Sequence, residues 1–97
     1  EDTTSLMRWA DQDMFCFVLY HKQRTWQDTR AATWTRALID AALDHGGRYY
    51  LPYRLHATPQ QFARAYPQAG RFATIKRDVD PDNRFRNLLW DRYLASP

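Results

Sequence analysis

Apolar and polar positions alternate in blocks along the chain, and two of these blocks have the spacing of β-strands. Residues 14–20 read MFCFVLY, an uninterrupted apolar run that predicts a strand buried on both faces. In residues 48–55 the side chains would alternate between two faces of a second strand, with tyrosine and leucine on one of them. Pro52 cannot donate a ladder hydrogen bond, so this strand is expected at a sheet edge or with a bulge.

Four further segments have the periodicity and end signals of helices. The first, over about 26–45, has a capping-box pattern at Thr25 and Asp28, and Gly46 and Gly47 would end it. The second begins at the Thr58-Pro-Gln-Gln box and stops at Tyr66, before a proline. A third is expected over 68–78, and a closing helix or turn over 85–94, with an Asp-Pro turn between them.

In the third helix, helical spacing places apolar residues together on one side, namely Phe72, Ile75 and Val79. It leaves Lys76 and Arg77 facing water. Two strands with several helices indicate an α+β fold, in which a small antiparallel sheet is packed by helices. A two-stranded sheet is marginal by itself. A third strand within residues 1–12, chain outside this sequence, or a second copy is therefore expected to complete the sheet.

The 97 residues suit one small domain, and the 14 Lys and Arg against 11 Asp and Glu leave a net charge of +3. Aromatic residues make up 15%, so many rings must be buried or offered to a partner. The sequence has no apolar run long enough to cross a bilayer and no signal-peptide pattern. Cys16 is the single cysteine, which favours a reducing compartment and a cytoplasmic location.

Several kinds of chemistry find little support in the residue pattern. His21, His45 and His56 lie in three different predicted elements without ligand spacing, so we expect no metal site. Cys16 lies inside an apolar run, where a thiol is usually an inert core residue. With three glycines in all, the chain has no phosphate-cradling loop and is not expected to bind a dinucleotide unaided.

Two binding functions remain open as alternatives to an enzyme. Several basic and aromatic residues near the C-terminus would suit nucleic acid, but aspartates interrupt them and favour a solvated charged face; the residues are Arg84, Arg86, Trp90, Arg92 and Tyr93. A small module that docks a partner protein through an aromatic surface is the other alternative. The densest chemical signal is in residues 48–56, where tyrosines, an arginine and a histidine either line a pocket or pack a core.

An ordered set of short motifs adds a family resemblance. The motifs are GGRYY at 46–50, Ala-Thr-x-x-x-Phe at 57–62 and AYP at 65–67, followed by Phe72, Lys76, Asp80-Pro81 and Phe85. From about residue 14 onward the chain resembles the C-terminal end of FAD-linked oxidoreductases of the vanillyl-alcohol-oxidase type. It is most similar to bacterial FAD/FMN-containing dehydrogenases related to decaprenylphosphoryl-ribose oxidases and sugar-lactone oxidases.

The resemblance implies that residues 1–97 are the C-terminal part of a substrate or cap domain, a fragment of a ferredoxin-like fold. FAD would be bound mainly by another domain of the same polypeptide, and this fragment would be inactive alone. The implied reaction oxidises the CH–OH group of a sugar-like alcohol and passes hydride to the flavin. No nucleic acid and no membrane span are implied, and a homo-oligomer through an exposed sheet edge is a further expectation.

The resemblance also implies roles for individual residues. Tyr50 matches a tyrosine that lines the pocket near the flavin, and Tyr53 stands where those relatives carry a lysine, which argues for a different substrate. Both tyrosines are candidate catalytic residues that position the substrate hydroxyl or assist proton transfer. The expected substrate-facing or flavin-facing residues are Cys16, Arg54 and His56. A regular strand would put Tyr50 and Tyr53 on opposite faces, so their shared role requires Pro52 to break the alternation.

Overall fold

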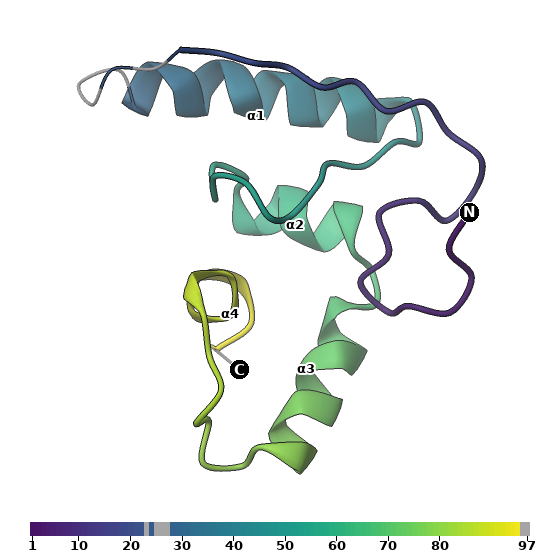
Figure 1. Cartoon of the computed structure of the whole chain (residues 1–97), viewed down its shortest axis with the longest axis vertical. Coiled ribbons are helices and arrows are strands. Elements are labelled where there is room, and N and C mark those ends of the chain that lie inside the picture. The colour runs from purple at the N-terminus through teal and green to yellow at the C-terminus, as the bar shows by residue number, and fades with distance from the viewer. Residues whose placement is uncertain (23, 25–27, 96–97) are drawn as a thin grey trace.

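Helix α2 lies between the long helix α1 and a pair of shorter helices, α3 and α4 (Figure 1). The computed structural model describes residues 1–22, 24 and 28–95. Its helices are α1 (Asp28–Asp44), α2 (Pro59–Ala65), α3 (Ala69–Val79) and α4 (Leu88–Tyr93). Residues 1–12 form a loop at the end of the molecule where α1 finishes, and residues 14–22 then run back along α1 in the opposite direction (Figure 1).

The predicted α+β fold with an antiparallel sheet is wrong, because no residue in the described ranges belongs to a strand. Residues 14–20 are extended but unpaired, and residues 48–55 form an irregular loop with a turn at Leu51 and Pro52. No backbone hydrogen bond of the described residues joins the two segments. A strand needs a neighbour for its backbone groups, and none of the residues that the structure describes pairs with either segment. The ferredoxin-like expectation fails for the same reason.

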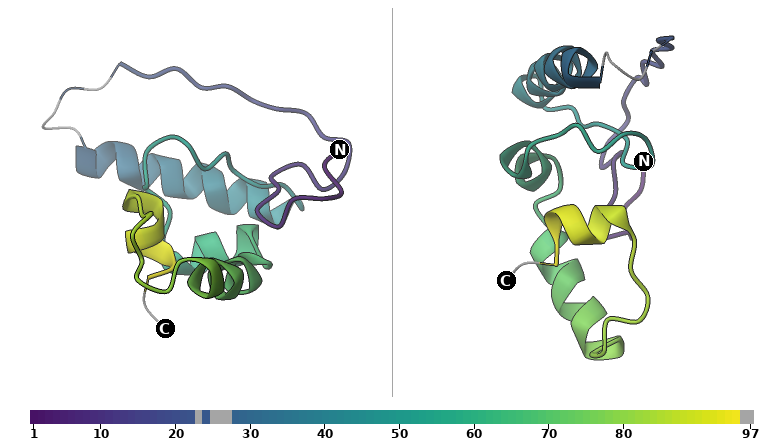
Figure 2. Two further views of the ribbon diagram at one scale, coloured as in Figure 1. Left: turned by 60° about the horizontal axis from the view of Figure 1, so that its bottom comes forward. Right: turned by 90° about the vertical axis from the view of Figure 1, so that its left-hand side faces the viewer.

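The predicted burial of residues 14–20 is also wrong. Phe15 is 94% exposed, Phe17 88% and Tyr20 96%, so large rings on this segment face solvent. In both views of Figure 2 the segment lies apart from α2, α3 and α4, which carry the core. An apolar run indicates that a segment needs covering, but it does not say which part of a protein supplies the cover.

The helix ends, by contrast, follow local sequence signals. At the end of α1, Gly46 has φ of 75°, and the N–H of Gly47 donates to the carbonyl of Ala42 at 2.7 Å. With the Gly46 N–H bonded to the carbonyl of Leu43, this is a Schellman motif. The capping box of α2 forms as predicted between Thr58 and Gln61. The box proposed at Thr25 lies outside the described residues.

The core lies where α2, α3 and α4 meet, and its fully buried members are few. Phe62, Tyr66, Trp90 and Leu94 are its large side chains, and alanines of α2 and α3 fill the spaces between them. Leucine, tyrosine and tryptophan side chains from α1, the loop after it and the N-terminal segment pack on the outside of this cluster. The α1–α2 loop is therefore held against the core from one side.

Helix α3 presents the opposite face to the one predicted. It buries Ala69 and Ala73, whereas Phe72 is 36% exposed and Val79 76% exposed. The Lys76 side chain is only 13% exposed, because its ammonium group bonds to Asp80 and Asn83, each at 2.5 Å. The same ammonium lies 4.6 Å from the centroid of the Trp90 ring. A polar network and a cation–π contact thus join α3 to α4, where periodicity alone indicated an apolar contact.

Candidate functional site

The loop between α1 and α2 carries most of the residues predicted to face a substrate, and hydrogen bonds fix both of its ends. Near its start, the Tyr66 hydroxyl donates to the carbonyl of Tyr49. Near its end, Arg36 Nε donates to the carbonyl of His56 at 2.6 Å, and the Tyr93 hydroxyl donates to that of Ala57 at 2.8 Å. All three donors come from helices or their caps. The loop is therefore anchored at its ends, while its middle part turns outward.

The turn in the middle of this loop brings Tyr50 and Tyr53 together. Their ring centroids are 5.6 Å apart and the rings meet edge to face, at 73°. Tyr50 is 48% exposed and Tyr53 71% exposed, so much of each ring remains open. The turn at Pro52 removes the strand alternation that would have separated them, as the shared role required.

A third ring completes the group, and sequence reasoning missed it. Trp9 meets Tyr50 edge to face, with centroids 5.8 Å apart. We call Trp9, Tyr50 and Tyr53 the aromatic cluster. Trp9 lies far from Tyr50 and Tyr53 in the sequence, so no local pattern could have indicated its contact with them.

Arg48 holds the N-terminal segment beside this loop. Its guanidinium donates to the Asp11 carboxylate and to the carbonyl of Arg8, both at 2.5 Å, and its side chain is only 13% exposed. These contacts span 37 and 40 positions of sequence. The arginine of the Gly-Gly-Arg motif was the only sequence signal for this clamp, and it was not assigned that role.

The neighbouring tyrosines, Tyr49 and Tyr66, have a structural role. The Tyr66 ring is 1% exposed, and the Tyr49 hydroxyl is buried with no hydrogen-bond partner among the described residues. Burial raises the pKa of both phenols far above the usual value, with nearby tyrosines adding to the effect at Tyr49. Neither phenol ionises near neutral pH, so neither supplies a base to a reaction at the surface.

The structure does not bring the other predicted site residues into the aromatic cluster. Cys16 is exposed on the segment that runs along α1. The Arg54 side chain is 73% exposed, and its guanidinium lies 3.9 Å from the carboxylate of Asp28. His56 is partly buried, and its backbone carbonyl, rather than its ring, makes the recorded hydrogen bond. No ring contact or hydrogen bond within the described ranges joins these three side chains to the cluster.

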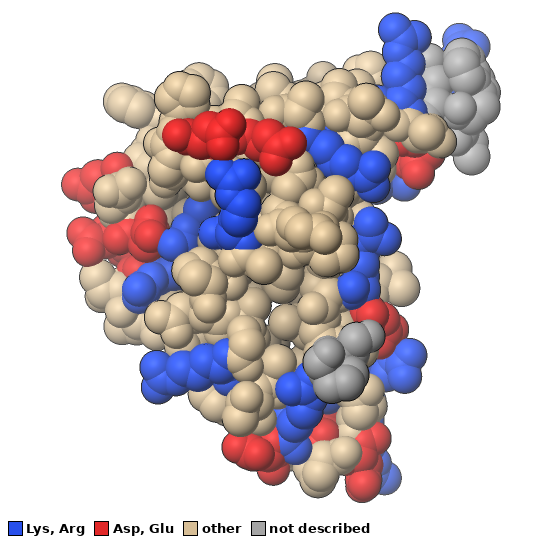
Figure 3. Space-filling model, turned by 180° about the vertical axis from the view of Figure 1, so that it is seen from behind, with Lys and Arg blue, Asp and Glu red and all other residues tan. Residues whose placement is uncertain are grey.

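The fold leaves little of the basic and aromatic surface that was considered for nucleic-acid binding. Trp90 is 6% exposed, and the Tyr93 ring stacks on Phe62 at 4.4 Å between centroids, so neither ring is free to stack on a base. On the face seen in Figure 3, basic and acidic side chains are interspersed and leave no continuous basic patch. No group of three potential metal ligands occurs in the part of the chain that the structure describes.

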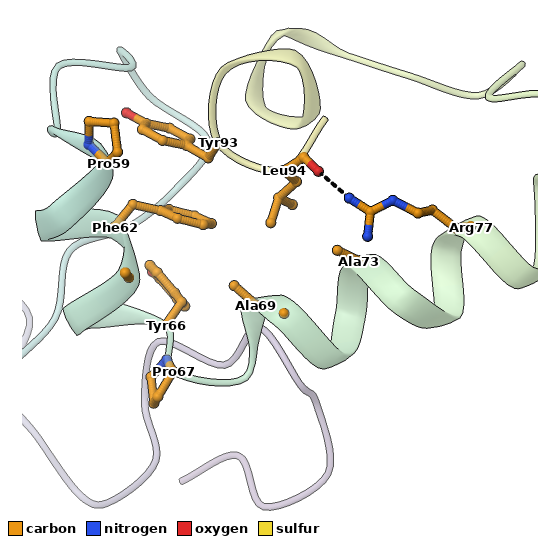
Figure 4. A pocket seen from close by; sticks show the side chains of 11 residues that line it. Pro59, Phe62, Tyr66, Pro67, Ala69, Ala73, Arg77, Tyr93 and Leu94 are labelled. Atoms are coloured by element: carbon orange, nitrogen blue, oxygen red, sulfur yellow. Dashed lines mark hydrogen bonds between the residues drawn. The ribbon is translucent and has the colours of Figure 1, made fainter. Parts of the chain in front are cut away.

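A separate hollow of about 330 Å³ opens between α2, α3 and α4 (Figure 4). Phe62, Tyr66, Tyr93 and Leu94 point toward it, and Arg77 closes one side by donating to the carbonyl of Leu94 at 2.9 Å. None of the predicted site residues lines it. The hollow is thus a gap beside the core, distinct from the aromatic cluster.

None of the described helices is long and apolar enough to cross a membrane.

Comparison with known proteins identifies the family. A family model described as D-arabinono-1,4-lactone oxidase matches residues 1–95. Searches of curated proteins and of solved structures gave no significant match. The matched residues include the loop, the aromatic cluster and all four helices. Because the match spans nearly the whole sequence, the chain belongs to the D-arabinono-1,4-lactone oxidase family.

Proposed function

We propose that this chain is the C-terminal part of the cap domain of an FAD-linked oxidoreductase of the vanillyl-alcohol-oxidase type. The enzyme would oxidise a CH–OH group of a sugar-like substrate. The family match over residues 1–95 is the observation that carries the proposal, because that family is one of FAD-dependent sugar-lactone oxidases. The proposal requires a flavin-binding domain elsewhere in the same polypeptide, and the chain would be inactive alone.

The aromatic cluster suits the isoalloxazine ring of FAD but not its pyrophosphate. Two tyrosine rings are exposed at an anchored loop, and such rings suit the edge or face of a planar isoalloxazine or the apolar face of a sugar. The sequence has only three glycines and no phosphate-cradling loop, so the pyrophosphate would be held by the other domain. When bound, FAD supplies the hydride acceptor for the oxidation.

The residues of this chain would then bind and orient the substrate. The Tyr50 hydroxyl, on a ring that contacts Trp9, would hydrogen-bond the hydroxyl group that is oxidised. Tyr53 offers a hydroxyl where the related ribose oxidases carry a lysine, which argues for a different substrate. Arg54 is exposed beside the cluster in sequence and would bind an anionic group of the substrate or offset charge on the reduced cofactor.

Exchange of Tyr50 for phenylalanine in the full-length enzyme tests this assignment. Tyr50→Phe keeps the ring and removes the hydroxyl, so kcat/KM should fall about tenfold while the urea midpoint of unfolding stays unchanged. Tyr20→Phe is the matched control, because this tyrosine is 96% exposed and lies outside the cluster. Wild-type kcat/KM in Tyr50→Phe would remove Tyr50 from the site.

The flavin requirement has a separate test that does not depend on turnover. The purified full-length protein should be yellow, with the absorption of an oxidised flavin, whereas the 97-residue chain should be colourless. A full-length protein that contains no flavin after reconstitution with FAD would refute the oxidoreductase assignment as a whole. The two experiments thus separate an error about Tyr50 from an error about the class.

A further inference from the structure

The N-terminal loop that carries Trp9 is closed by its own hydrogen bonds. The N–H of Asp2 donates to the carbonyl of Ala10 at 2.7 Å, which joins the two ends of the loop. Inside the loop, the Asp2 carboxylate accepts from the N–H groups of Thr4 and Ser5, each at 3.0 Å. Because these bonds restrict the backbone, holding Trp9 in one place costs less conformational entropy than it would in an open segment.

Arg48 joins this loop to the core at points on both sides of Trp9. Its guanidinium donates to the carbonyl of Arg8 and to the carboxylate of Asp11, both at 2.5 Å. The same guanidinium lies 5.9 Å from the centroid of the buried Tyr66 ring. With its side chain 13% exposed and its planar fork bonded at two points, Arg48 fixes the loop relative to the core.

Trp9 in turn limits where the Tyr50 ring can lie. The Tyr50 ring is 48% exposed, and it meets Trp9 at 5.8 Å and Tyr53 at 5.6 Å between centroids. Of these two neighbours, Tyr53 is itself 71% exposed. Trp9, by contrast, packs against the core cluster and belongs to the clamped loop. The position of the Tyr50 ring is therefore tied to the core through Trp9.

We propose that Trp9 is a positioning residue for Tyr50, and that Arg48 sets the place of Trp9. The inference rests on the proposed function, in which the Tyr50 hydroxyl bonds the substrate. A displacement of about 1 Å at a reacting group can cost about a hundredfold in rate, so a wall that fixes this ring affects turnover. Trp9 and Arg48 act through Tyr50 and need not touch the substrate.

A double-mutant cycle in the full-length enzyme tests the role of Trp9. Trp9→Leu keeps an apolar side chain and removes the ring, so kcat should fall by up to about tenfold with KM within about twofold. In the Tyr50→Phe background the same change should cost less than about twofold, because the hydroxyl that Trp9 positions is already gone.

Two further variants complete the cycle. Trp9→Phe restores a ring and should recover most of the lost kcat. Trp34→Leu is the matched control, because Trp34 lies on α1 and meets His21 at 5.3 Å instead of the aromatic cluster. It should leave kcat within about twofold of the wild-type value.

The clamp has a readout that does not require turnover. In the full-length enzyme labelled with 3-fluorotyrosine, the ¹⁹F resonance of Tyr50 is identified by its loss in Tyr50→Phe. Arg48→Met should shift or broaden this resonance, because Trp9 is released from beside the ring. Arg48→Lys keeps the charge without the two-point fork, and should shift the resonance by a smaller amount even if Arg48→Met does not fold. Arg64→Met removes an exposed ion pair with Asp44, at 2.9 Å, and should leave the resonance unchanged.

The outcomes separate this inference from the proposed function. If Trp9→Leu costs nothing, or costs the same with and without the Tyr50 hydroxyl, Trp9 does not position Tyr50. If neither Arg48 variant moves the Tyr50 resonance, the clamp does not control the ring. Both results leave the proposed function standing when Tyr50→Phe itself loses activity. Wild-type activity in Tyr50→Phe would instead refute the assignment of Tyr50, and this inference with it.

Discussion

Replacement of Tyr66 by phenylalanine is expected to destabilise the chain and to loosen the loop that carries the aromatic cluster. Tyr66 is 1% exposed, and its hydroxyl donates to the carbonyl of Tyr49, immediately before Tyr50. The ring also meets Tyr49 edge to face, at 5.7 Å between centroids. Tyr66→Phe retains this ring contact and removes only the donor, so it isolates the hydrogen bond.

The expected magnitude follows from what the substitution leaves behind. A typical hydrogen bond contributes about 0.5–1.5 kcal/mol net, and a buried acceptor left without a donor costs about 1–3 kcal/mol. The Tyr49 carbonyl belongs to a partly buried residue, so a loss of about 1–2 kcal/mol in the free energy of unfolding is expected. For a domain of this size that corresponds to a fall in Tm of roughly 4–16 °C.

Urea unfolding followed by tryptophan fluorescence measures the free energy, and hydrogen exchange of the amides of residues 50–54 measures the loop. Tyr66→Phe should lower the urea midpoint and speed exchange in the loop. Tyr53→Phe is the control, because this tyrosine is 71% exposed and its hydroxyl has no hydrogen-bond partner among the described residues, so its effect should stay within about 0.5 kcal/mol. Equal effects of the two substitutions would refute the anchoring role.

Two further predictions concern the ends of the helices. Thr58→Ala removes the oxygen that accepts from the Gln61 N–H at 3.1 Å, and should cost about 1 kcal/mol in urea unfolding, whereas Gln60→Ala should cost less than about 0.5 kcal/mol. Hydrogen bonds from Lys76 and from two backbone N–H groups lower the pKa of Asp80 to about 2. Its contribution to stability is therefore complete above the unfolded pKa, near 3.8, and is lost as pH falls through about 2. Asp80→Asn should have a lower free energy of unfolding than the wild type at pH 7, and this difference should shrink below pH 4. A difference that does not change with pH would refute this account. The control, Asp82→Asn, should keep the wild-type dependence of stability on pH.

Helix ends were predictable because their hydrogen bonds close within a few residues. The box at Thr58 and Gln61 and the left-handed Gly46 each satisfy groups that lie next to them in the sequence. The strand predicted over residues 48–55 does not form, and the turn at Pro52 brings Tyr50 and Tyr53 together instead. The helix ends need no information about the rest of the fold.

The errors arose where the outcome depended on distant parts of the chain. The uninterrupted apolar run in residues 14–20 was compatible with a buried strand, but burial requires other elements to cover both faces. Lys76 was expected in water because helical spacing set it on the side away from Phe72 and Ile75, and only the positions of Asp80, Asn83 and the Trp90 ring explain its burial. Trp9 was missed because the Arg48 clamp that holds it spans up to 40 residues.

The sequence alone determined where the helices stop and which loop carries the tyrosines, since those outcomes depend on neighbouring backbone groups and on proline geometry. Tertiary structure decided that Trp9 meets Tyr50, that Lys76 lies beneath Trp90, and that residues 14–20 remain bare. The physical reason is that a helix satisfies its own backbone groups, whereas strands and ring contacts take partners from anywhere in the chain or from another chain.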